Sequence, residues 1–110
     1  MKLPNADSAV IEQAKLERYL LDIDHPIGGA KARLLVSLGY SAANWPLLAR
    51  DLRAMHLAED MAAVRQTPWG VRYEIVAPIV GPGGDTVLFR SIWQIDLGTE
   101  SPRLITMYPE

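Results

Sequence analysis

The sequence predicts an α+β fold, in which N-terminal helices pack on one face of a C-terminal antiparallel β-meander of three to four strands. In the first half of the 110 residues, apolar side chains recur every three or four positions, as on one face of a helix. From Trp69 onward they recur every second position, as in a half-buried strand. Short glycine-rich turns separate the strand-like segments, which favours antiparallel pairing of neighbours. The length indicates one domain, residues 1–110.

The first predicted helix covers residues 14–21, where Leu16, Tyr19 and Leu20 share one face and charged residues lie between them. A short edge strand at residues 10–11 can precede it.

A second helix is expected over residues 30–38, ended by Gly39. A third follows Asn44, a residue suited to capping, with Pro46 in its first turn, and is expected to end near Ala58. Its apolar face comprises Trp45, Leu48, Leu52 and Met55. Its opposite, charged side comprises Arg50, Asp51 and Arg53.

Three alternating segments, residues 71–80, 87–96 and 103–108, are predicted to be strands. The segment GPGGD (residues 81–85) supplies the hairpin turn between the first two, because glycine accepts the positive φ that tight turns need. A fourth strand around residues 61–64 is possible on pattern. Strict alternation assigns Arg103, Ile105 and Met107 to one face of the last strand. The same count assigns Leu104, Thr106 and Tyr108 to the other.

Composition excludes several classes of function. The chain has no cysteine, which rules out disulfides, thiolate catalysis and cysteine-ligated zinc. Two distant histidines and an isolated Asp22–Asp24 pair give no basis for a metal site or another cofactor. The net charge of −2 argues against nucleic-acid binding driven by bulk charge, although a small site of a few cations is compatible with it. No apolar run approaches the roughly 20 residues needed to cross a bilayer, and the N-terminal residues do not resemble a signal peptide. The expectation is therefore a cytoplasmic protein without membrane contact.

The stretch DHPIGGAKARLL (residues 24–35) is the first candidate site. A glycine-rich turn that opens a helix directs backbone N–H groups toward an anion, and Lys31 in the first helical turn would add a full charge. His25 has a side chain of the kind that exchanges protons near neutral pH, which suits a general acid or base. The competing interpretation is structural: Gly28 and Gly29 permit close packing, and Lys31 lies on the solvated side of a helix.

The polar side of the last two strands is the second candidate. If Arg90 and a hydroxyl of the final strand share an open face, they form a compact set of donors suited to phosphate. The competing interpretation is that a sheet with one wet face carries such residues in any case. Contact of His25 or Lys31 with Arg90, Arg103 or Thr106 would favour chemistry.

Other polar or aromatic residues have ordinary explanations. A contact with the negative end of a helix dipole accounts for His56. Packing in the core or in half-buried positions accounts for the three tryptophans, Trp45, Trp69 and Trp93.

Three segments, LPNA (residues 3–6), HPIGGAKA (25–32) and PRLITMYP (102–109), resemble a family of small uncharacterised bacterial proteins, a domain of unknown function. The family pattern reads LPNA, HPxGxxKA and PRLVTxYP, and the resemblance covers essentially the whole chain. It implies a fold similar to that of barnase, colicin-type and RelE-type ribonucleases, in which RNA lies across an open sheet and is cleaved without a metal. Leu35 stands where the family usually has phenylalanine, and the acidic balance departs from a typical nuclease.

Two functions follow as hypotheses. The first is a metal-independent ribonuclease-like toxin domain, with RNA as partner. In it, His25, Lys31 and Thr106 would be catalytic, and the substrate-binding residues would be Gly28, Arg90, Arg103 and Tyr108. The alternative is a non-catalytic binding module, an accessory, immunity-like or antitoxin-like protein that grips a cognate protein partner with its sheet.

Overall fold

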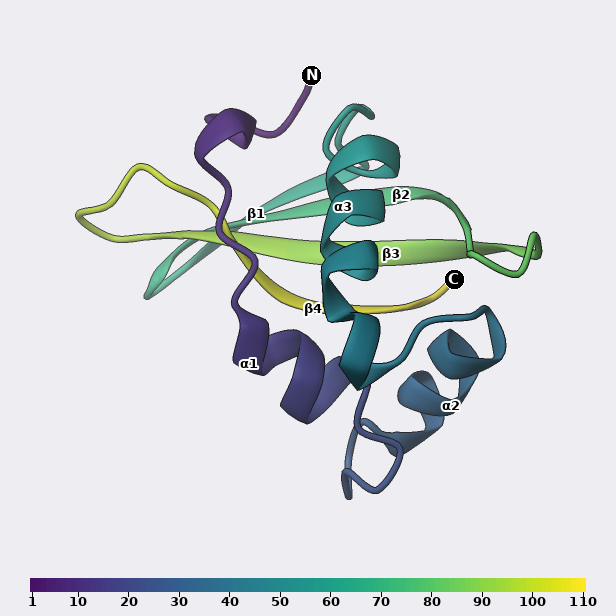
Figure 1. Cartoon of the computed structure of the whole chain (residues 1–110). Coiled ribbons are helices and arrows are strands. Elements are labelled where there is room, and N and C mark those ends of the chain that lie inside the picture. The colour runs from purple at the N-terminus through teal and green to yellow at the C-terminus, as the bar shows by residue number, and fades with distance from the viewer.

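The computed structural model of the protein describes all residues, 1–110, and confirms an α+β fold with the helices first (Figure 1). Four antiparallel strands form one sheet in the order β1-β2-β3-β4. The helical elements, in chain order, are η1 (Ala6–Ser8), α1 (Gln13–Lys15), η2 (Leu16–Leu20), α2 (Gly29–Ser37), η3 (Ala42–Asn44) and α3 (Trp45–Met55). The strands are β1 (Ala63–Thr67), β2 (Gly70–Val80), β3 (Thr86–Asp96) and β4 (Arg103–Pro109).

The helices cover one face of the sheet. In Figure 1, α3 lies across the strands, while α1 and α2 lie toward the β4 edge. Leu48 and Leu52 of α3 are fully buried in one cluster with Ile75 of β2 and Trp93 of β3. This single apolar layer holds the two halves together, because burying side chains of this size stabilises a fold by about 1.5–3 kcal/mol each. The opposite face of the sheet has no helix over it in Figure 1. The strand alternation places Glu74, Arg90 and Gln94 on that open face.

The first helical segment widens after one turn. The N–H of Leu21 donates to the carbonyl of Leu16 at 2.8 Å, five residues back, so Leu16–Leu20 forms a π-type turn rather than the expected continuous α-helix. Leu16 and Leu20 are fully buried, and Tyr19 points toward the sheet edge. Such wide turns are rare and often accompany functional sites.

The boundaries of the other helices are close to prediction. Gly39, at φ +106°, terminates α2 as expected. Asn44 caps differently from the prediction, because it exchanges hydrogen bonds with Ser41 around η3 rather than capping α3. The helix α3 ends at Met55 instead of near Ala58.

Two polar residues of the third helical region are buried, contrary to expectation. The sequence predicts Asp51 on the charged side of its helix, opposite the apolar face, but Asp51 is 4% exposed and accepts a hydrogen bond from the hydroxyl of Tyr40. His56, assigned to a contact with the helix dipole, is completely buried between Ser91 and the carbonyl of Ala77. Charge patterning along a helix cannot reveal a partner that comes from another element.

The strands follow the predicted meander. The additional strand predicted around residues 61–64 is β1, which begins two residues later, at Ala63. Between β3 and β4, Ile92 pairs with Thr106 and the next residue, Trp93, pairs with Leu104. Ile105 of β4 is therefore an extra, bulged residue. The bulge makes the strict alternation count wrong: Arg103 shares the open face with Thr106, the residue opposite Ile92. Val10 forms only a one-residue parallel bridge to β4.

Candidate functional site

Three polar side chains converge at the β4 edge of the sheet. The Lys31 ammonium donates to the Thr106 hydroxyl at 3.1 Å and also to the Tyr19 hydroxyl. The hydroxyls of Tyr19 and Thr106 are 3.2 Å apart. These residues come from η2, α2 and β4, and they are separated by up to 87 positions in the chain. The predicted pair Lys31 and Thr106 is therefore in direct contact, whereas Tyr19 was not anticipated.

Local backbone structure places each of the three groups. The wide turn η2 directs Tyr19 to the edge strand, and Lys31 lies in the first turn of α2. Gly28 leaves the space that the tyrosine ring needs, since a Cβ there would lie 2.7 Å from Tyr19 Cε1. The bulge in β4 keeps Thr106 on the open face at the point where helices and sheet meet.

His25 packs against this cluster and caps the loop. Its ring stands edge-on to the ring of Tyr19, with the two centroids 5.0 Å apart. Its Nδ1 atom accepts the backbone N–H groups of Ile27 and Gly28 at 3.1 and 3.0 Å. When the ring is neutral, its proton therefore lies on Nε2. The N–H of Gly29 donates to the carbonyl of His25, so the free amides expected at Gly28 and Gly29 are already engaged.

The electrostatics of the cluster favour a bound anion. The Lys31 ammonium is partly buried and contacts two hydroxyls but no carboxylate. Burial raises the pKa of Tyr19, but hydrogen bonds with Lys31 and Thr106 and the positive charges of Lys31 and Lys15 oppose burial, so the net effect is a lowered pKa. A cation and two hydroxyls without a counter-charge match the oxygens of a phosphate or another oxyanion.

Thr106 also connects the cluster to a hollow in the open face of the sheet. The hollow has a volume of 310 Å³, and two arginines, one carboxylate and one exposed tyrosine are among the side chains that line it. Its lining residues are Arg65, Thr67, Arg72, Glu74, Ile92, Thr106 and Tyr108. A ligand in the hollow would therefore reach the Lys31 cluster across the shared Thr106.

The predicted arginines lie on the open face, but carboxylates hold both of them. Arg90 stands opposite Tyr108 in the strand register and forms ion pairs with Glu74 and Glu110, both at 2.8 Å. Arg103 donates from Nε to Asp96 at 2.7 Å, near the other end of β4. Neither arginine contacts the Lys31 cluster directly. The predicted donor set thus divides into a cluster of Lys31, Tyr19 and Thr106 and two paired arginines.

Sequence reasoning missed Tyr19, Glu74 and Glu110. Tyr19 matches the apolar period of its helix, so its sequence position predicts packing and gives no sign of a polar role. Glu74 alternates with apolar residues of β2, as any solvated strand residue does. Glu74 is nevertheless only 8% exposed, because Arg65 and Arg90 of the neighbouring strands cover its carboxylate.

A family model described as a domain of unknown function (DUF6883) matches residues 2–110. The chain belongs to this family. A search of curated proteins found no match.

A solved structure shares the fold. It is titled a contact-dependent growth inhibition toxin–immunity protein complex from Klebsiella pneumoniae 342, and a chain in it superposes with a TM-score of 0.71 at 18% sequence identity. The match covers 92% of this chain and 99% of that chain. At this identity the likeness establishes the fold and no shared chemistry.

Proposed function

We propose that this domain is a metal-independent ribonuclease of the toxin kind, with its active site at the Tyr19–Lys31–Thr106 cluster. The observation that carries the proposal is the direct contact of Lys31 with Thr106 and Tyr19, beside a hollow on an uncovered sheet. A cation unopposed by a carboxylate is suited to a phosphodiester, and the open sheet gives a single strand of RNA room to lie. The fold is shared with a chain of a toxin–immunity complex, a setting that a toxin domain and an immunity protein fit equally.

The residues fit cleavage by the RNA 2′-hydroxyl. In this step, the 2′-oxygen bonds to phosphorus, the bond from phosphorus to the 5′-oxygen breaks, and the products are a 2′,3′-cyclic phosphate and a 5′-hydroxyl. In the reactive form Tyr19 has lost its hydroxyl proton and takes the 2′-hydroxyl proton, and the Lys31 ammonium gives a proton to the departing 5′-oxygen. Their direct contact then returns the proton from Tyr19 to Lys31 and resets the pair.

The other residues bind and orient the substrate in this proposal. Thr106 holds a phosphate oxygen, and Tyr108 supplies an aromatic surface on the rim of the hollow. His25, expected as an acid or base, presents a single N–H donor at Nε2 in this conformation, which suits a hydrogen bond to phosphate.

The test is cleavage of a labelled RNA by the purified domain, with EDTA present and with the matching DNA as a second substrate. RNA cleavage that resists EDTA, leaves cyclic phosphate ends and spares DNA is expected. Tyr19→Phe removes one hydroxyl and keeps the ring, and it should lower the rate at least about 100-fold, as loss of a proton-transfer group does. Tyr73→Phe is the matched control, because it makes the same change on β2, where the Tyr73 ring packs against the core outside the cluster. Cleavage of DNA, or equal rates for Tyr19→Phe and the parent, would refute the proposal.

A protein-binding module is the second candidate function, and a specific observation favours it. Arg65, Arg90 and Arg103 on the open face are each paired with a carboxylate, so the sheet presents mixed charge instead of a basic surface. Mixed charge suits a protein partner, as in a toxin–immunity pair. Under this function, charge reversal at Arg65 abolishes binding to the cognate partner, whereas Lys31→Ala leaves it unchanged.

A further inference from the structure

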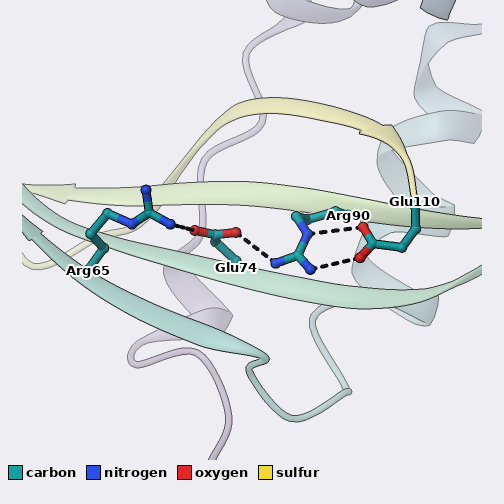
Figure 2. A network of polar contacts seen from close by, with 4 residues as sticks. All are labelled: Arg65, Glu74, Arg90 and Glu110. Carbon is teal, nitrogen blue, oxygen red and sulfur yellow. Dashed lines mark hydrogen bonds and ion pairs between the residues drawn. The ribbon is translucent and has the colours of Figure 1, made fainter.

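Four charged side chains form a continuous row across the open face of the sheet (Figure 2). They alternate in sign, in the order Arg65, Glu74, Arg90 and Glu110. Glu74 accepts from Arg65 at 3.1 Å through one oxygen and from Arg90 at 2.8 Å through the other. Glu110 accepts from Arg90 at 3.0 Å and 2.8 Å.

The two carboxylates use different sides of the Arg90 guanidinium. Glu74 takes only the Nη1 donor, which fixes the orientation of the planar group. Glu110 takes Nε and Nη2 together, the pair of parallel donors that grips a two-oxygen anion. A phosphodiester presents two oxygens in similar geometry, so the Glu110 carboxylate occupies the edge of Arg90 that a phosphate would use.

The two carboxylates also differ in how firmly they are held. The Glu74 side chain is 10% exposed, lies within the β2 ladder and has two arginine partners. The Glu110 side chain is 33% exposed and has Arg90 as its single partner. The backbone N–H of Glu110 donates to the Leu88 carbonyl at 2.9 Å, so its side chain can turn away without disturbing the strand.

Arg90 lies at the distance from the proposed catalytic cluster at which a bound RNA strand would place its next phosphate. Arg90 pairs with Tyr108, and Thr106 lies two residues back along β4. At about 3.4 Å per residue along β4 and about 4.8 Å between neighbouring strands, the Cα atoms of Arg90 and Thr106 are about 8 Å apart. This separation is of the order of one nucleotide step along an extended single strand.

We infer that Arg90 is a second phosphate-binding site for single-stranded RNA and that Glu110 blocks it by occupying the same donors until RNA displaces it. The inference rests on the proposed function for its choice of ligand. Glu74 serves as the positioning residue that keeps the Arg90 edge directed toward the incoming phosphate.

The experiment measures binding without cleavage, using a fluorescently labelled single-stranded RNA oligonucleotide whose 2′-hydroxyls are methylated. We expect Glu110→Gln to raise affinity about 3- to 10-fold, because it releases the two donors of Arg90. Glu100→Gln is the matched control, since it removes the same charge from an exposed loop and should change affinity less than 2-fold. In the Arg90→Gln background, Glu110→Gln should give no gain, and the salt dependence should lose about 0.7 in log–log slope, the value for one phosphate contact.

Circular dichroism shows whether Arg90→Gln folds. Arg90→Lys is the second variant, because it keeps the positive charge but removes the paired donors, and Glu110→Gln should give no gain in affinity in this background either. Equal gains from Glu110→Gln and Glu100→Gln, a gain that persists without Arg90, or no binding by any variant would overturn the inference. Inorganic phosphate, added as a competitor, shows whether an isolated anion suffices to occupy Arg90. Failure of the nuclease proposal is seen separately, as uncleaved natural RNA with an intact Arg90–Glu110 coupling.

Discussion

Acidification from pH 8 to 5 should destabilise the domain through His56, which is fully buried beside Ser91 and Trp93. The Trp93 indole N–H donates to the Ser91 oxygen at 2.8 Å, and the Ser91 hydroxyl then donates to His56 Nδ1 at 2.7 Å. His56 Nε2–H completes the chain by donating to the Ala77 carbonyl at 3.0 Å. The network fits a neutral imidazole, because Nδ1 must remain an acceptor.

Burial lowers the pKa of His56, while the Ala77 carbonyl and the charge of Glu59 oppose the shift only partly. The unfolded chain therefore binds this proton more readily than the folded one. Stability contributed by the neutral ring is complete above the unfolded pKa of about 6.5 and is lost as pH falls below it. One site changes the unfolding free energy by at most about 1.4 kcal/mol per pH unit, which gives up to about 2 kcal/mol between pH 6.5 and 5.

The assay is urea unfolding at half-unit pH steps, followed by tryptophan fluorescence, with His56→Gln as the non-titrating control. The control starts from a lower stability, so the slopes against pH are compared instead of the absolute values. The pKa values of Asp96 and Glu110 are lowered by hydrogen bonds from Arg103 and Arg90 respectively, so both ion pairs persist through this window. Parallel slopes for the parent and His56→Gln would refute the assignment of the acid sensitivity to this network.

Two further substitutions test the packing around the site and beneath it. Gly28→Ala should lower the free energy of unfolding, followed by thermal denaturation, by about 1–3 kcal/mol, because the new Cβ would lie 2.7 Å from Tyr19 Cε1. The same change should reduce RNA cleavage, since it displaces the Tyr19 ring. Gly83→Ala, whose nearest contact would be 3.4 Å, is the control and should change neither. Tyr40→Phe should cost about 1.5–3 kcal/mol in denaturant unfolding, since it removes the hydroxyl that serves the buried Asp51 carboxylate; a value near zero would show that this carboxylate finds another donor.

Much of the fold is readable in the sequence, because its signals are local. The alternation over residues 71–80 and 87–96 and the turn at residues 81–85 suffice for the central hairpin. Gly39 marks the end of its helix through its own backbone conformation. The alternation count failed at Ile105, since a bulge has no distinct residue type here and depends on pairing with β3.

The site was only partly predictable, for a related reason. The HPIGGAKA turn marked Lys31, and the final strand marked Thr106, but nothing local indicated that Tyr19 joins them. The neutralisation of Arg90 by Glu74 and Glu110 is set by strand register, which brings together residues 16 and 20 positions apart. Contacts of this kind depend on three strands at once, so a count along one segment cannot reveal them.

The wide turn at Leu16–Leu20 gives a rule for sorting relatives of this chain. In a regular helix each residue adds about 100° of rotation, so a relative with one residue fewer in this segment would direct its tyrosine away from the edge strand. Spacing between this tyrosine and the HPxGxxKA turn would then separate relatives that keep the tyrosine–lysine contact from those that have lost it. Residue spacing, and not residue identity alone, is thus the feature to compare across the family.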